Sequence, residues 1–352
     1  MTDAMPDYSQ SGVNLIEDST PKADGFYFPA EWHPHDKTIM VLPSPQNWSG
    51  YGISMDKVRI QWADVANALA AFEDVLMVIR PEDRKAAKNI FSSEIELIEM
   101  PINDGWSRDI GPSFVIDGKG NRRVAGFTFN GWGAKFPPFD DDAMLKARLS
   151  KHFGADMYAI DFVTEGGALA VDGEGTCIAT LSSLLNKNRN PGLDQATVEK
   201  ILNDSLGTEK VIWLAKGVEP DPVTDGHVDG IAAFAAPGTV LVHTTDNRSD
   251  PSFKSSQDAL RRLSEATDAK GRKLEVIEVP LDGVVSNLNF YIGNGVVLVP
   301  ITEDPDQDER PMGVLEDVFG DRYEVIGVNA EVLGKGGGGV HCVTQQVPTA
   351  GA

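Results

Sequence analysis

The chain has 352 residues, 41% hydrophobic and 24% charged, a composition that supports a sizeable buried core and argues against disorder over most of its length. It carries 31 lysines and arginines against 53 acidic residues, and the formal net charge of −22 disfavours nucleic acid and anionic membranes as partners. That charge favours the approach of a small cation, although acidic surfaces are also common for solubility alone.

Residues 1–25 are polar and show no sustained helical or strand period. We expect a loosely ordered N-terminal arm there, or an extension that contacts a second copy in a homo-oligomer, followed by a single folded domain over residues 26–350. The start has no apolar stretch long enough for a signal peptide, and no later segment approaches the length of a membrane span. We therefore expect a cytoplasmic protein.

Apolar runs bounded by glycine, proline and acidic residues predict alternating helices and strands along the rest of the chain. Helices are predicted over residues 63–72, 142–153, 194–206, 255–267 and 312–319. Strands are predicted over residues 75–79, 114–117, 123–130, 157–163, 210–214, 231–235, 239–243, 274–279, 290–292, 296–299 and 323–328.

The order strand, strand, helix, strand recurs several times, at a spacing of about 65 to 75 residues. This repetition suggests radial symmetry, and the paired strands of each unit argue against a doubly wound parallel sheet. No Gly-x-Gly-x-x-Gly follows a strand and no phosphate-binding P-loop is present. The sequence therefore favours an α/β fold built from repeated units.

Cys177 and Cys342 are the only cysteines, which excludes a disulfide framework and argues against a cysteine-based zinc site. Cys342 follows four glycines, so backbone amides or cationic groups can approach and stabilise its thiolate. That arrangement favours a nucleophile, and the alternative is a buried apolar cysteine after a flexible turn. Cys177 lies in a strand-like run and is predicted to belong to the core.

In the segment His227-Val228-Asp229, an extended backbone would point His227 and Asp229 to the same side. The histidine can then serve as general acid and base, and the carboxylate can pair with a cationic substrate. The alternative is an aspartate that caps a turn beside a structural histidine.

Two further acidic residues stand next to glycine or an aromatic ring. Glu165 precedes two glycines and could orient His227 and keep it protonated, although Glu-Gly-Gly alone is also a common turn. Asp109, with Trp106 nearby, suits a guanidinium through a carboxylate and an indole face. A surface ion pair between Arg108 and Asp109 is the simpler alternative.

Other chemistries have weaker support. The spacing of His33 and His35 suits two metal ligands, but no cysteine cluster supplies the rest, so no metal site is predicted even though carboxylates could contribute. No Gly-x-Ser-x-Gly elbow is present to anchor a serine hydrolase.

Taken in order, several segments resemble the agmatine deiminase family, over about residues 26–348. They are residues 29–35 (PAEWHPH), 106–112 (WSRDIGP), 129–133 (FNGWG), 165–167 (EGG), 171–176 (VDGEGT), 185–191 (LNKNRNP), 226–229 (GHVD), 289–292 (NFYI) and 337–346 (GGGVHCVTQQ). The order and the approximate spacing of these motifs both agree with the family, which makes the resemblance specific.

The resemblance implies a pentein fold, a five-bladed α/β propeller of pseudo-fivefold symmetry with the site on its axis. It makes Cys342 the nucleophile, His227 the general acid and base, and Glu165 the partner of His227. Asp109 and Asp229 become the clamps of a guanidinium substrate, with no metal and no organic cofactor. The implied reaction converts agmatine to N-carbamoylputrescine and ammonia through a thiouronium on the cysteine.

Three departures from the family pattern concern the pocket beyond the guanidinium. Ala170 stands where a histidine is expected and Gly230 where a larger polar residue is usual, and the tryptophan-rich pattern near Pro43 is replaced by residues 41–45 (VLPSP). Another guanidino compound or a peptidyl arginine therefore stays open as the substrate. An amidinotransferase, and a propeller that binds a polyamine without turnover, also stay open as functions.

Overall fold

The computed structural model describes residues 5–48, 52–283 and 285–351. Its strands are β1 (Leu15–Ile16), β2 (His35–Val41), β3 (Val75–Ile79), β4 (Glu96–Glu99), β5 (Ser113–Ile116), β6 (Arg122–Thr128), β7 (Met157–Val163), β8 (Ala170–Val171), β9 (Thr176–Thr180), β10 (Lys210–Leu214), β11 (Ala232–Ala236), β12 (Thr239–Thr244), β13 (Glu275–Pro280), β14 (Tyr291–Gly293), β15 (Val296–Ile301), β16 (Glu324–Asn329) and β17 (Gln345–Pro348).

The α-helices are α1 (Pro45–Trp48), α2 (Met55–Leu69), α3 (Arg84–Ile90), α4 (Ser107–Ile110), α5 (Gly131–Ala134), α6 (Asp140–His152), α7 (Leu181–Leu184), α8 (Gln195–Leu206), α9 (Phe253–Glu265), α10 (Pro305–Phe319) and α11 (Glu331–Lys335). Short 3-10 turns are η1 (Tyr8–Ser11), η3 (Pro81–Asp83), η4 (Gly166–Ala168), η5 (Val228–Gly230) and η6 (His341–Val343).

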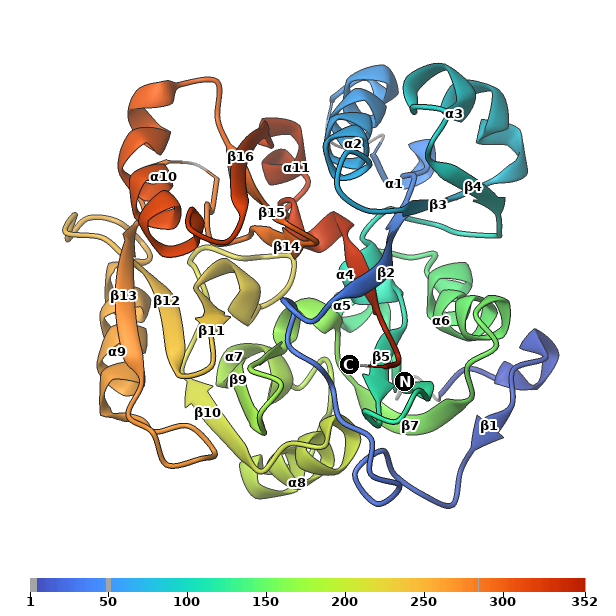
Figure 1. Ribbon diagram of the computed structural model, residues 1–352, viewed down its shortest axis with the longest axis horizontal. Helices are drawn as coiled ribbons and strands as arrows, with labels where there is room; N and C mark the ends of the chain where they lie inside the picture. Colours follow the sequence, from blue (N-terminus) through green and yellow to red (C-terminus); the bar gives the residue numbers. More distant parts are fainter. Residues whose placement is uncertain (1–4, 49–51, 284, 352) are drawn as a thin grey trace.

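These strands form five small sheets arranged around a central axis, with the longer helices on the outside (Figure 1). The sheets have the strand orders β1-β7-β6-β5, β10-β9-β8, β11-β12-β13, β14-β15-β16 and β17-β2-β3-β4. The five-bladed α/β propeller implied by the family resemblance is confirmed.

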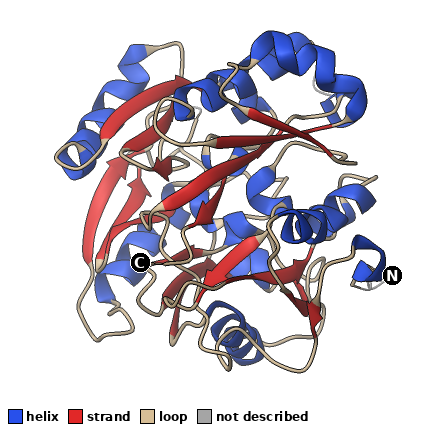
Figure 2. Ribbon diagram, turned by 45° about the vertical axis from the view of Figure 1, so that its right-hand side comes forward, coloured by secondary structure: helices blue, strands red, loops and turns tan. Residues whose placement is uncertain are grey.

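Each blade repeats one topology, which the third sheet shows well. Strands β11 and β12 are antiparallel, and α9 then leads from β12 to β13, which runs parallel to β12. A parallel pair needs a crossover connection, and the helix supplies it on the outer face of the sheet. Figure 2 shows the helices outside the strands from a second direction.

Strands β3 and β15, each paired with a strand on either side, are apolar along almost their whole length. All five residues of β3 are buried, as are the first five of β15. Such continuous apolar runs are typical of strands covered on both faces.

The chain closes the propeller by pairing its two ends. The last strand, β17, runs antiparallel to β2, with Gln345 opposite Ile39 and Val347 opposite Lys37. The first blade therefore takes its innermost strand from the C-terminus, which brings the segment before β17 to the axis. Neither β2 nor β17 was predicted from the sequence.

Two expectations differ from the structure. Residues 5–25 pack on the propeller, because Tyr8 is buried and β1 pairs in parallel with β7, whereas we expected a loosely ordered arm; residues 1–4 lie outside the described part of the chain. The repeat is also shorter than predicted, because short turns join strand, helix and strand; the units begin at Ser113, Ala170, Ala232, Tyr291 and Gln345.

Within the described ranges, no helix is long and apolar enough to cross a membrane.

Candidate active site

Four short turns meet at the propeller axis, and each carries or adjoins residues selected from the sequence. Helix α4 contacts both η4 and η6, and η4 contacts η5. Through these turns Asp109, Glu165, His227, Asp229 and Cys342 come together, although 233 sequence positions separate the first from the last. The convergence of these five side chains is the central prediction of the sequence, and the structure contains it.

A cavity of about 390 Å³ opens beside these turns. Cys342, His227 and Asp229 contribute to its wall, whereas Asp109 and Glu165 do not line it. The other described residues of the wall are Val218, Pro220, Asp221, Pro222, Val223, Thr224, Gly230, Ser286, Asn289, Gly334, Lys335, Gly337, Gly338 and Gly339. The cavity is large enough for a small organic substrate.

The glycine run before Cys342 is required by close packing. A Cβ on Gly338 would lie 2.4 Å from an edge atom of the Trp106 ring, and a Cβ on Gly339 would lie 2.6 Å from the Oδ1 of Asn289. Contacts this short are not tolerated, so the backbone can approach these groups only as glycine. The turn thereby places Cys342 at the cavity wall.

The thiol of Cys342 is mostly buried, with 9% of the residue exposed. Its Sγ lies 3.3 Å from Asn289 Oδ1 and 3.7 Å from Asp229 Oδ2. Burial, followed by the negative charges of Asp229 and Asp109, raises the pKa of the Cys342 thiol well above its usual range. The side chain is therefore a protonated thiol in the unliganded site. Asn289 was not selected from the residues alone, and only its place in a family motif marked it.

His227 is held between two carboxylates. Its Nε2 lies 3.2 Å from Glu165 Oε2 and its Nδ1 lies 3.9 Å from Asp109 Oδ1. Burial alone would lower the pKa of His227, but the carboxylates of Asp109 and Glu165 raise it to about 9. The imidazole is thus protonated at neutral pH.

The predicted backbone of this segment was wrong, although both side chains reach the cavity. His227 precedes the 3-10 turn η5, which contains Asp229, so the two side chains do not alternate along an extended strand. The geometry of the turn brings the two side chains together, and the pattern of hydrophobic residues in the sequence does not reveal such a turn.

Glu165 is fixed by a buried arginine that the sequence analysis did not select. Arg189 Nε donates to Glu165 Oε1 at 2.7 Å, and both side chains are fully buried. Burial would raise the pKa of Glu165, but Arg189 and His227 lower it to about 2. Glu165 is therefore a carboxylate that orients His227, as expected. The sequence signal for Arg189 lay in the motif LNKNRNP.

Asp109 accepts hydrogen bonds on both oxygens. Trp132 Nε1 donates to Oδ2 at 2.8 Å, and the amide of Gly167 donates to Oδ1 at 3.0 Å. Burial, reinforced by Glu165 and Asp229, keeps the pKa of Asp109 above its ordinary value despite the nearby His227. The alternative of a surface pair with Arg108 is wrong, because both residues are buried and Arg108 pairs with Glu31 at 3.0 Å.

Asp229 is paired with the histidine that precedes the cysteine. His341 Nδ1 lies 2.9 Å from Asp229 Oδ2. Burial would raise the pKa of Asp229, but this hydrogen bond and the charge of His341 lower it. The carboxylate is therefore ionised and available to a cation in the cavity.

Trp106 lies behind the glycine run, not in the cavity. Its ring stacks on Trp48 with centroids 5.9 Å apart and meets Trp62 edge to face at 5.4 Å. It is not among the described residues that line the cavity. Trp106 packs against Gly338 of the turn that carries Cys342, and its expected contact with a substrate stays a prediction.

The remaining candidates lie away from the cavity. Cys177 is buried in β9, where burial and then Asp172 raise its pKa to about 12, so its assignment to the core is confirmed. His33 bonds the carbonyl of Thr349, and His35 bonds Glu73. Among the described residues, no group of three or more potential ligands could hold a metal ion.

Gly167 gives a direct test of how closely these groups pack. An added Cβ there would lie 2.7 Å from His227 Nδ1, 2.8 Å from Asp229 Oδ2 and 3.0 Å from Asp109 Oδ1. We expect Gly167→Ala to push these groups apart and to lower kcat/KM about a hundredfold, since small misplacements of catalytic groups have large effects. Steady-state kinetics would measure this loss. Gly313→Ala, at a helix position with nothing within 4 Å, is the control and should match the wild type; equal kinetics for both variants would contradict this packing.

Comparison with known proteins agrees with the geometry. The agmatine deiminase of Pseudomonas aeruginosa is 40% identical over 364 residues, covering 94% of this chain and 97% of the relative. The agmatine deiminase of Ectopseudomonas mendocina is 37% identical with the same coverage. The solved structure of the agmatine deiminase of Enterococcus faecalis superposes with a TM-score of 0.90 at 34% identity, covering 96% of this chain and all of that one.

A five-bladed α/β propeller with a thiol at its axis defines the pentein class, and this protein is a cysteine-dependent hydrolase of guanidino groups. The model of the Porphyromonas-type peptidyl-arginine deiminases matches residues 27–348. The chain belongs to that family.

Proposed function

We propose that this protein is an agmatine deiminase, which hydrolyses the guanidinium of agmatine to N-carbamoylputrescine and ammonia. The observation that carries the proposal is the meeting of Cys342, His227 and Asp229 at one cavity wall, with Asp109 and Glu165 directly behind. The names of the relatives point to the same substrate. A free thiol as nucleophile also fits our expectation of a cytoplasmic, reducing location.

Asp109 and Asp229 are the proposed guanidinium clamps. A guanidinium is planar and presents N–H donors in a fixed fork, which carboxylates recognise with high directional specificity. Because the backbone amide of Gly167 and the indole of Trp132 hold Asp109, its carboxylate needs little reorganisation on binding. The clamps would fix the plane of the cation and bring its central carbon to the sulfur of Cys342.

The bound cation also provides a reason for the thiol to ionise. The carboxylates of Asp229 and Asp109 raise the pKa of Cys342 while the cavity is empty. A guanidinium held between these carboxylates offsets their negative charge, so the pKa of the thiol falls when substrate binds. Activation of the nucleophile is then coupled to the arrival of a cation.

The chemistry proceeds through two tetrahedral species. The thiolate of Cys342 attacks the guanidinium carbon, and the imidazolium of His227 gives its proton to one nitrogen, which leaves as ammonia. The resulting thiouronium is attacked by water, whose proton His227 takes as a neutral base. His227 has then regained its proton, and the second species gives its hydroxyl proton to the solvent as the C–S bond breaks, which expels the thiolate and leaves a ureido product.

A substrate panel tests the proposal. Agmatine, free arginine and an arginyl peptide would each be assayed for ammonia and for ureido product. We expect kcat/KM for agmatine to exceed that for arginine about tenfold or more, because the strongly negative protein favours a dication over a molecule with a carboxylate. Lys335 is the one lysine or arginine that the described wall offers to a carboxylate, which is why both arginine compounds belong in the panel.

The panel also separates agmatine hydrolysis from amidino transfer and from binding without turnover. An amidinotransferase passes the amidino group to an acceptor amine and releases no ammonia. The assay is therefore run with and without such an amine. A polyamine-binding propeller would bind agmatine and release no ammonia. Preference for an arginyl peptide would replace agmatine as the substrate and leave the proposed cysteine chemistry in place.

A further inference from the structure

His341, the residue before the nucleophile, lies between two carboxylates. Its Nδ1 is 2.9 Å from Asp229 Oδ2 and its Nε2 is 2.8 Å from Glu31 Oε2. A neutral imidazole carries one N–H, so it can donate to only one of these carboxylates. Donation to both requires an imidazolium, and the pKa of His341 is raised: burial and Arg108 lower it, but Glu31 and Asp229 outweigh them.

Glu31 is itself held from its other side. Its Oε2 also accepts from Arg108 Nη2 at 3.0 Å, and its Oε1 accepts from the amide of Ile292 at 2.9 Å. Arg108 in turn donates to Gln346 Oε1 at 2.7 Å. A continuous series of charged groups, Arg108, Glu31, His341 and Asp229, therefore crosses the propeller axis and ends at the substrate cavity.

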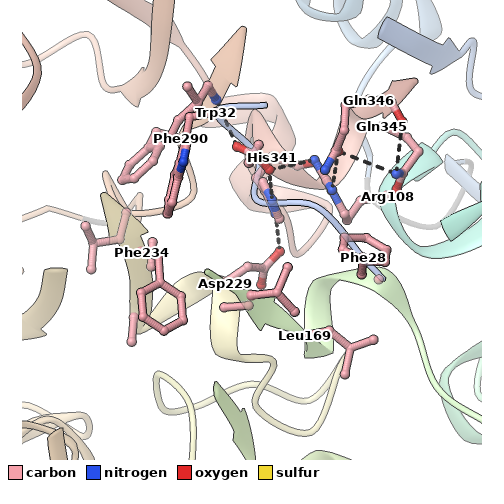
Figure 3. Close-up of a pocket in the computed structure, with 18 residues that line it drawn as sticks. Phe28, Trp32, Arg108, Leu169, Asp229, Phe234, Phe290, His341, Gln345 and Gln346 are labelled. Carbon is pink, nitrogen blue, oxygen red and sulfur yellow. Dashed lines mark hydrogen bonds and ion pairs between the residues drawn. The ribbon is translucent and has the colours of Figure 1, made fainter. Parts of the chain in front are cut away.

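The surroundings of this series are largely apolar. A second cavity of about 60 Å³ lies on the other side of Asp229, and Figure 3 shows Phe28, Trp32, Phe234 and Phe290 around it. Hydrogen bonds between ionised groups are stronger where water is scarce. The series is thus a rigid support, while His341 itself is not among the described residues that line the substrate cavity.

We propose that His341 is a positioning residue for the reaction, held by Glu31 as its anchor, which fixes the Asp229 carboxylate ionised and aimed at the guanidinium. Asp229 Oδ2, the oxygen that His341 holds, is also the one that lies 3.7 Å from the sulfur of Cys342. His341 therefore sets the distance between clamp and nucleophile without exchanging a proton with the substrate. This inference rests on the proposed function, because it assigns Asp229 to the guanidinium.

Two substitutions of His341 separate its two contacts. In His341→Gln the amide nitrogen takes the place of Nε2, so the bond to Glu31 survives and the bond to Asp229 is lost. In His341→Asn the amide nitrogen takes the place of Nδ1, so the bond to Asp229 survives. Binding would be measured by calorimetry with agmatine, in a Cys342→Ala background that prevents turnover.

We expect Kd for agmatine to rise roughly ten- to a hundredfold in His341→Gln, as when an outer partner of a ligating group is removed. The rise in His341→Asn should be clearly smaller, because one hydrogen bond to the clamp remains. In an Asp229→Asn background, His341→Gln should add less than about a twofold change, since the effect passes through Asp229. Glu31→Gln should weaken binding in the same direction as His341→Gln, by less.

His35→Gln is the matched control. His35 is also a buried histidine beside a carboxylate, with Nδ1 3.3 Å from Glu73 Oε2, and it does not line the substrate cavity. Its Nε2 lies 2.8 Å from the carbonyl oxygen of Glu31, and the amide nitrogen of glutamine takes the place of Nε2, so the variant keeps this bond to the anchor. We expect it to lower the melting temperature without raising Kd. Suppose that the wild type releases ammonia from agmatine but that the parent, His341→Gln and His341→Asn bind agmatine with equal Kd values. The role of His341 would then be wrong, and the proposed function would stand. The expected order of Kd values without ammonia release would sustain the inference and overturn the proposed function.

Discussion

Replacement of Cys342 by alanine is expected to reduce ammonia release at least about 10⁴-fold, the scale seen when a covalent nucleophile is removed. No other group near the guanidinium clamps can form the thiouronium, because the neighbouring side chains are carboxylates, an amide and an imidazole. The fold should survive, since alanine fits where the thiol makes only weak contacts. Ammonia release would be measured under substrate saturation, and circular dichroism would report the fold.

Cys177→Ala is the matched control for the loss of a buried thiol. Cys177 lies in β9, where its Sγ contacts the carbonyl oxygen of Ile178, and it is not among the described residues that line the cavity. We expect this variant to lose some stability and to keep the wild-type kcat. Wild-type turnover in Cys342→Ala, or loss of turnover in Cys177→Ala, would contradict a covalent mechanism on Cys342.

Much of the fold could be predicted from the sequence, because the strands and helices of each blade have clear patterns in short segments of the chain. The strands at residues 75–79, 157–163 and 210–214 were predicted with the bounds that the structure shows. Each is a compact apolar run between polar turns, so its period and its ends are both visible. The helix predicted at residues 63–72 belongs to α2, which begins at Met55 after the capping side chain of Ser54.

The features that escaped prediction depend on contacts between distant segments. Strand β2 begins with the polar residues His35 and Asp36, and only its second half is a buried, mostly apolar run. The polar start makes the segment resemble a loop in the sequence. Its pairing with β17 joins residues about 300 positions apart in sequence, and no local pattern reports such a pairing.

The residues of the site also divide into those with a local signal in the sequence and those without one. The cysteine after a glycine run and the residues His227 and Glu165 carry local signals, because reactive groups beside flexible backbone are unusual. Arg189 and His341 carry no such signal as single residues, since an arginine in a loop or a histidine beside a cysteine is ordinary until its partners are known; only their places in the family motifs marked them. Their roles arise from contacts with Glu165 and Asp229, which come from other blades.

Loss of His227 should have the second largest effect. We expect His227→Gln to lower kcat roughly 10²- to 10⁴-fold, the usual contribution of a general acid and base. The amide can still bond Glu165, so the local packing is kept, but it can neither protonate the leaving ammonia nor take a proton from water. Rapid mixing with agmatine should therefore show that formation of the thiouronium and its hydrolysis are both slowed.

The pH dependence of kcat in Glu165→Gln tests whether His227 transfers protons or only supports the structure. In the wild type, Asp109 and Glu165 raise the pKa of His227 to about 9, so the imidazolium needed for the first step is present at neutral pH and lost as pH rises through about 9. Removing the charge of Glu165 lowers that pKa toward 6.5, so the alkaline limb of kcat should move to lower pH while activity below pH 6.5 is least affected. A limb that stays near pH 9 in Glu165→Gln would show that another group sets it. Because His227→Gln has no imidazole to titrate, its residual activity should lack this limb, and the two profiles together assign the proton transfer to one side chain.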